Sequence, residues 1–174
     1  MSLTAEPAVT SGRTLDWSDP LARRVRVLRE SSSVVLRFAL GFSLLSAVAD
    51  RFGLWGAFGQ PNVAWGSFAS FVAYTGQLNW FLPEAIYPTL AIAATFAEIL
   101  LGILLVLGWQ TRAAAFLSGV LLLIFAVTMT AALGIKAPLN FGVFSAMGGA
   151  FLLASCEEYP LSIDHLRGES LRDA

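Results

Sequence analysis

The sequence predicts an all-α integral membrane protein, a four-helix bundle with both termini in the cytoplasm (N-in/C-in). Hydrophobic residues make up 56% of the 174 residues and charged residues only 13%, and the mean hydropathy is +0.69. This composition leaves too little polar surface for a water-soluble globule of this length. Four apolar stretches form one predicted membrane domain, residues 34–155, with spans at residues 34–50, 86–107, 113–133 and 139–155.

The two middle spans have the strongest pattern. Residues 86–107 carry a single charge and residues 113–133 carry none. At ~1.5 Å of rise per residue, about 20 residues cross a hydrocarbon core ~30 Å thick. Residues 34–50 and 139–155 are shorter and contain more small or polar residues, so their insertion depends on helical neighbours.

Small residues indicate where the helices pack. In the fourth span Gly142, Ala146 and Ala150 repeat every four residues, a spacing that lets two membrane helices approach closely. The contact candidates are Gly41 and Ala47 in the first span and Ala91, Thr95 and Gly102 in the second. We therefore expect the fourth span to pack centrally through its small face.

Basic residues predict the orientation, because cytoplasmic loops of membrane proteins are rich in Lys and Arg. An N-in arrangement places eight basic residues inside and two outside, with Arg37 inside a span and uncounted, which accounts for all 11. The inner group is Arg13, Arg23, Arg24, Arg26, Arg29, Arg112, Arg167 and Arg172, and the outer group is Arg51 and Lys136. Residues 1–18 are predicted to be a disordered tail and residues 156–174 a polar C-terminal tail.

Residues 19–33 are predicted to form a basic amphipathic juxtamembrane helix. Asp19 can cap a helix that begins at Pro20. Apolar residues then recur at i, i+4 and i+7, with arginines around the rest of the helix; these apolar residues are Leu21, Val25 and Leu28. The pattern is typical of a helix on an anionic leaflet, and a solvated basic turn is the alternative.

The long outer loop between the first two spans is rich in aromatic residues. Residues 62–76 are predicted to form an interfacial helix, because aromatic side chains favour the headgroup region. Some of these rings are candidates for the wall of a site for a flat apolar ligand; simple anchoring of the loop is the alternative. The candidate wall is Trp65, Phe68, Tyr74 and Trp80.

Glu98 is the most informative polar residue, because it lies near the middle of the second span. An uncompensated charge at that depth costs at least ~2.5–3.5 kcal/mol. Arg37, about one turn into the first span, is the predicted partner on the neighbouring helix. The pair is either a structural pin that fixes the register of two helices, or it leaves Glu98 as a protonatable group beside a substrate or quinone pocket.

A second polar cluster is predicted at the outer mouth of the bundle. Asp50 and Arg51 end the first span, and Lys136 and Asn140 lie between the third and fourth spans. Lys136 is the only lysine and could neutralise Asp50 or Glu84, bind an external anion, or snorkel to the interface.

Several kinds of chemistry are disfavoured by the residues that the chain lacks. The single cysteine, Cys156, cannot form the dithiol of a thiol oxidoreductase. The single histidine, His165, falls in the polar tail, so no facing histidines could ligate haem. No metal site and no nucleic-acid partner are expected. A redox role would therefore need a bound organic carrier or a partner protein.

The order of several motifs resembles the DoxX family of membrane proteins. These motifs are LRFALG, ADRFGLWG, FVAYTGQLNWFLP, LLVLGWQTRAAA, FAVTMTAALGIKAPLN and VFSAMGGAFLLA, and the resemblance covers residues 34–164. It implies a four-helix membrane bundle whose relatives include a small subunit of thiosulfate:quinone oxidoreductase and membrane components tied to oxidative-stress defence. The matching polar positions are Arg37, Asp50, Arg51, Glu98 and Lys136.

Three functional hypotheses follow. The first is a quinone-linked redox subunit of a bacterial-type cytoplasmic (inner) membrane, acting with a partner protein and possessing no catalytic set of its own that the sequence identifies. The second is a small transporter in which Glu98 is a proton or cation site in a homo-oligomer. The third is a non-catalytic scaffold subunit. All three share the lipid bilayer as a partner.

Overall fold

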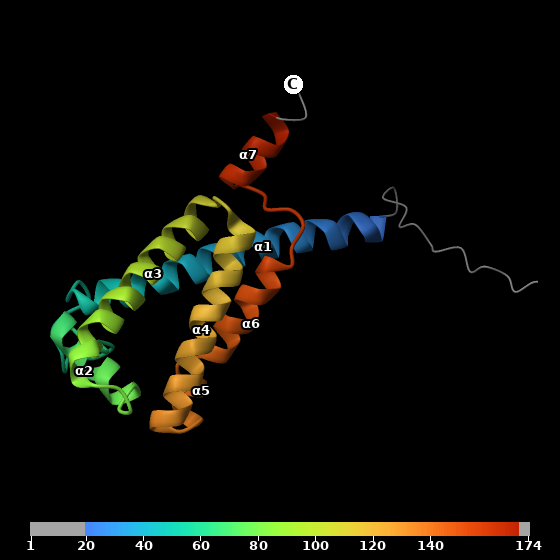
Figure 1. Ribbon diagram of the computed structural model, residues 1–174. Helices are drawn as coiled ribbons and strands as arrows, with labels where there is room; N and C mark the ends of the chain where they lie inside the picture. The colour runs from blue at the N-terminus through green and yellow to red at the C-terminus, as the bar shows by residue number, and fades with distance from the viewer. Residues whose placement is uncertain (1–19, 171–174) are drawn as a thin grey trace, which may run out of the picture.

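The structure, a computed structural model, describes residues 20–170. Within these residues every regular element is a helix, as Figure 1 shows. Three helical stretches are long and apolar enough to cross a membrane: Pro20–Arg51, Glu84–Leu107 and Thr111–Leu133. The predicted all-α fold is confirmed for this part of the chain, and its long apolar helices fit a membrane helical bundle. The tail predicted at residues 1–18 lies outside the described residues.

The first helix, α1, runs without interruption over Pro20–Arg51. The sequence predicts two separate segments here, residues 19–33 and residues 34–50. No glycine or proline divides the two segments, so nothing in the backbone breaks the helix between them. The hydroxyl of Ser33 donates to the carbonyl of Glu30 (2.8 Å) within the helix, which satisfies this polar side chain without interrupting the helical hydrogen bonds.

The N-terminal end of α1 extends beyond the other helices (Figure 1). The predicted apolar residues of this end, Leu21, Val25 and Leu28, are all exposed. They contribute nothing to the core of the bundle, so this end of α1 is left with an uncovered apolar surface among its arginines.

The helix in the long loop begins later than predicted. α2 spans Phe68–Leu78, whereas the sequence predicts residues 62–76. Asn62 and Gly66 both have φ 64°, a left-handed conformation that cannot continue a right-handed helix. Ser67 then caps the helix, since its side chain accepts a hydrogen bond (3.2 Å) from a backbone N–H of the first turn.

The short 3₁₀ helix η1 (Glu84–Ile86) leads into α3 (Tyr87–Leu107). A tight turn then joins α3 to the next long helix. α3 ends at Gly108, whose φ of 68° is the left-handed conformation that glycine adopts at helix ends. α4 (Thr111–Leu133) begins three residues later.

The predicted polar tail is docked on the bundle and contains a helix, α7 (Ile163–Ser170). The carboxylate of Asp164 accepts hydrogen bonds from the backbone nitrogens of Gln110 (2.9 Å) and Thr111 (2.7 Å) and from the Thr111 hydroxyl (2.8 Å). The first N–H groups of a helix have no partner inside it, so a carboxylate there both caps the helix and complements its dipole. Asp164 therefore fixes the start of α4.

The fourth apolar stretch is divided in two. α5 (Lys136–Asn140) and α6 (Val143–Ala154) meet at Gly142, which has φ 66°. The 12 residues of α6 rise only ~18 Å at 1.5 Å per residue, less than the ~30 Å of a hydrocarbon core. The continuous span predicted over residues 139–155 is therefore not formed by α6 alone.

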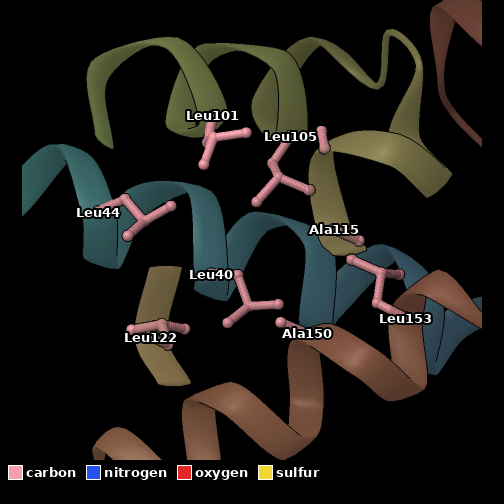
Figure 2. Close-up of a cluster of buried hydrophobic side chains, with 9 residues drawn as sticks. Leu40, Leu44, Leu101, Leu105, Ala115, Leu122, Ala150 and Leu153 are labelled. Carbon is pink, nitrogen blue, oxygen red and sulfur yellow. The ribbon is translucent and has the colours of Figure 1, made fainter. Parts of the chain in front are cut away.

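The long helices share one apolar core, part of which Figure 2 shows. In that view the leucines of α1 lie between α3 and α6. α6 packs against α4 and also against α1, and its Ala150 is fully buried, which confirms that its small face lies inward. The buried core residues are Leu40, Leu44, Leu101, Leu105, Ala114, Ala115, Leu122, Ala150 and Leu153.

Two glycines allow α1 and α3 to approach closely. A Cβ at Gly41 would lie 3.1 Å from the Gly102 carbonyl oxygen, and a Cβ at Gly102 would lie 3.2 Å from that of Gly41 and 2.8 Å from Leu45 Cγ. The predicted contacts at Gly41 and Gly102 are confirmed. Since the obstacle includes backbone, a side chain at either glycine would force the helices apart.

We expect Gly102→Leu to lower the free energy of unfolding by about 1–3 kcal/mol, because the new side chain overpacks the α1–α3 contact. Thermal unfolding of the purified protein in one detergent measures this. Gly148→Leu is the matched control, since nothing lies within 4 Å of a Cβ there. Equal melting temperatures for the two variants would contradict the close approach.

Candidate functional site: a buried arginine–glutamate pair

The most distinctive polar contact is an ion pair between the last residue of α1 and the middle of α3. Nη1 of Arg51 lies 2.6 Å from Oε2 of Glu98, and Nη2 donates to Oε1 at 2.7 Å. Each side chain is only 2% exposed. A guanidinium that meets both oxygens of a carboxylate fixes the geometry as well as the charge of the pair.

Thr95 completes the polar contacts of the pair. Its hydroxyl accepts a hydrogen bond from Nη1 of Arg51 (2.8 Å) and donates to the carbonyl of Ala91 (2.8 Å). Thr95 lies three residues before Glu98 in α3, so both side chains project from one helix face. The ion pair and the hydroxyl thus form one buried polar cluster between α1 and α3.

Aromatic rings cover the guanidinium of Arg51. Its Cζ lies 3.6 Å from the ring centroid of Phe71 and 5.3 Å from that of Trp65, distances that favour cation–π attraction. The rings also contact one another: the centroid of Trp65 lies 5.8 Å from that of Tyr74, and the centroid of Phe68 lies 6.3 Å from that of Phe71. We call Trp65, Phe68, Phe71 and Tyr74 the aromatic cover.

Asp50 positions the loop that carries part of this cover. Its Oδ2 accepts hydrogen bonds from the backbone nitrogens of Ala64 (3.1 Å) and Trp65 (2.8 Å). Oδ1 is buried and has no hydrogen-bond partner among the described residues. Asp50 thus ties the loop backbone to the end of α1, next to Arg51.

The predicted pairing of Arg37 with Glu98 is wrong, because α1 and α3 run antiparallel in a different register. Gly41 of α1 lies opposite Gly102 of α3. Arg51, ten residues after Gly41, therefore lies beside Thr95 and Glu98. Arg37, four residues before Gly41, instead lies beside the end of α3.

Arg37 belongs to a separate site. It is only 1% exposed, and its Nη2 donates to the carbonyl of Leu161 at 2.6 Å. A Cβ at Gly108 would collide with Nη1. Nε and Nη1 of Arg37 are buried without a hydrogen-bond partner among the described residues. Arg37 therefore binds the C-terminal segment and not the carboxylate of α3.

The predicted outer-mouth cluster is not formed as one group. Asp50 and Arg51 are buried, whereas Lys136 and Asn140 are exposed on α5. Among the described residues Lys136 makes no ion pair with Asp50 or Glu84. The helix end that carries Arg51 is covered by the aromatic loop.

The predicted aromatic wall is formed in part. Trp65, Phe68 and Tyr74 belong to the aromatic cover, while Trp80 is 69% exposed and contacts the ring of Phe81. Two further residues of the site lie outside the predicted wall and the predicted polar pair. Thr95 and Phe71 could have been found from their helical spacing, one turn from Glu98 and from Phe68 respectively.

The site offers hydrogen-bond donors more than metal ligands. Nε of Arg51 is buried and has no hydrogen-bond partner among the described residues. Burial raises the pKa of the Tyr74 phenol, so this group remains a protonated donor at neutral pH. Over residues 20–170 no group of three or more His, Cys, Asp or Glu side chains is arranged to hold a metal ion.

Comparisons with known proteins give no relative. No protein-family model matches the chain, and no curated protein or solved structure matches it either.

The ion pair predicts non-additive effects on stability. Arg51→Gln and Glu98→Gln should each lower the free energy of unfolding by about 3–5 kcal/mol, because each leaves one uncompensated buried charge. The double variant should lose less than the sum, by at least about 1 kcal/mol. Thermal and denaturant unfolding in one detergent measures this cycle.

The matched control is the cycle of Arg37→Gln with Glu98→Gln. Arg37 faces Gly108, ten residues and ~15 Å along α3 from Glu98. These two substitutions should therefore add within about 0.5 kcal/mol. Additivity in the Arg51 cycle, or coupling in the Arg37 cycle, would overturn the assignment of partners.

Proposed function

We propose that the chain is a DoxX-like, quinone-linked membrane subunit that acts with a redox partner protein. The observation that carries the proposal is the buried Nε–H of Arg51, which has no hydrogen-bond partner among the described residues and lies beneath aromatic rings. A buried unpaired donor of this kind costs free energy unless a ligand or water satisfies it.

A quinone headgroup fits this combination of groups. It is a flat ring with carbonyl oxygens, so it can accept a hydrogen bond from Arg51 and stack on the rings of Trp65 or Tyr74. The rings of the aromatic cover contact one another, so the headgroup would enter by displacing the ring of Trp65 or that of Tyr74. The half-buried state of both side chains makes them suited to such a movement.

The quinone would supply the electron-accepting chemistry, and this chain would bind and orient it. Arg51 would hold a carbonyl oxygen, and Glu98 would keep the guanidinium in place through its two contacts. Glu98 is also an ionisable group in the interior of the bundle, and intramembrane carboxylates frequently mark proton pathways. A partner protein would deliver the electrons.

We also propose that the chain crosses a bacterial-type cytoplasmic membrane four times, with both termini inside. α5 and α6 together would form the fourth crossing. The exposed ion pair of Arg29 with Glu157 (2.8 Å) supports this arrangement, because it joins the N-terminal half of α1 to the chain just after α6. The excess of arginines in these segments favours the cytoplasmic side.

Two other functions rest on the same pair. Proton-coupled transport by a homo-oligomer is favoured by the position of Glu98 inside α3, and a non-catalytic scaffold is favoured by the mutual compensation of Arg51 and Glu98. The Glu98→Gln variant distinguishes the quinone-linked subunit from these two functions. Loss of quinone binding supports the first proposal, loss of ion flux with quinone absent supports transport, and lower stability alone supports a scaffold.

The direct test is native mass spectrometry of the protein extracted gently from its own membrane. We expect a bound quinone in the wild-type spectrum and at least about fivefold less of it in Trp65→Ala, since one ring contact contributes about 0.5–1.5 kcal/mol. Trp80→Ala removes the same side chain away from the aromatic cover and should retain the quinone. A wild-type protein that carries only phospholipid would overturn the proposal.

A further inference from the structure

A second candidate site lies where the ends of α3 and α6 meet the start of α4 and α7. A cavity of ≈ 770 Å³ opens there. It lies near Arg37 and Asp164, at the opposite end of the α1–α3 contact from Arg51. Its lining includes Trp109, Arg112, Phe116, Tyr159, Asp164 and Arg167.

The polar rim of this cavity favours an anion. The lining contains two arginines, Arg112 and Arg167, and one carboxylate, Asp164. That carboxylate already accepts three hydrogen bonds at the start of α4. The charge of Asp164 therefore stabilises the helix end, and the two arginines are the cationic groups that the lining offers to an anionic ligand.

Neighbouring groups hold the two arginines in place. Nη2 of Arg112 donates to the carbonyl of Cys156 (3.0 Å). Cζ of Arg167 lies 5.6 Å from the ring centroid of Trp109. A guanidinium carries five N–H donors and binds phosphate oxygens in pairs. Trp109 and Tyr159 beside them have the amphipathic rings that favour a membrane interface.

Part of the lining is apolar and adjoins an exposed apolar face of α4. Ala113, Phe116 and Ala154 form this part, and Phe116 is 52% exposed. Leu123 and Val127 lie on the same helical face as Phe116, at i+7 and i+11, and are also exposed. An apolar track therefore leads away from the two arginines.

We propose that this cavity binds the headgroup phosphate of an anionic phospholipid, with an acyl chain laid along the apolar track of α4. Positive pockets between membrane helices on the cytoplasmic side recognise such lipids through the same combination of arginine and apolar surface. The lipid spans both parts of the site, which a soluble phosphate ester cannot do. The site is separate from the quinone site and does not depend on it.

The test is a lipid titration of the full-length protein in detergent, read by native mass spectrometry. Phosphatidylglycerol is compared with phosphatidylcholine of the same acyl chains. We expect the wild-type protein to prefer phosphatidylglycerol, and Arg112→Gln combined with Arg167→Gln to weaken its binding about tenfold or more, at about 1 kcal/mol per arginine. Binding of phosphatidylcholine should change little.

A second variant tests the cavity without altering charge. Ala113→Leu adds volume to the lining and should reduce phosphatidylglycerol binding at least about fivefold, whereas Ala93→Leu, at an exposed site on α3, should not. Melting temperatures check that the variants fold. Equal affinity of the wild type for the two lipids, unchanged binding by Ala113→Leu, or full competition by glycerol 3-phosphate would each overturn the proposal. Quinone retention is read in the same spectra and reports separately on the other site.

Discussion

The ion pair between Arg51 and Glu98 determines how α1 lies against α3. A buried charge that loses its partner costs about 3–5 kcal/mol, so neither of these buried side chains is stable alone. The contacts of 2.6 and 2.7 Å bring the end of α1 to the middle of α3. The close approach of Gly41 and Gly102 lies ~15 Å away along α1 and agrees with the same register. Two contacts at that separation fix the direction of one helix relative to the other.

The end of α1 also organises the long loop, through two neighbouring residues with different partners. Arg51 attracts the faces of Trp65 and Phe71, and Asp50 binds the backbone of the loop at Trp65. Trp65 is therefore held both by its backbone and by its ring. This double attachment explains how a loop of more than ten residues between α1 and α2 brings its aromatic side chains to one place, and it makes the aromatic cover dependent on the ion pair beneath it.

The sequence predicts the elements that local pattern controls, and it misses those that depend on register or tertiary contacts. Glu98 could be identified because a single carboxylate in an apolar stretch is conspicuous. Its partner could not, because the choice between Arg37 and Arg51 depends on how far α3 is shifted along α1. The start of α2 depends on the left-handed backbone of Gly66, and the docking of the C-terminal segment depends on Asp164, which meets the start of α4 only in the folded chain.

The two buried arginines of α1 divide the bundle into chemically different ends. Arg51 meets a carboxylate and apolar rings, which compensate its charge within the bundle. Among the described residues Arg37 donates a hydrogen bond to the carbonyl of Leu161 alone, and it interacts at longer range with Asp164. Both of these groups belong to the C-terminal segment. The burial of Arg37 therefore depends on the docking of that segment. Without the segment, the buried guanidinium would lose the groups that compensate its charge. The C-terminal segment is thus part of the folding unit of the membrane bundle.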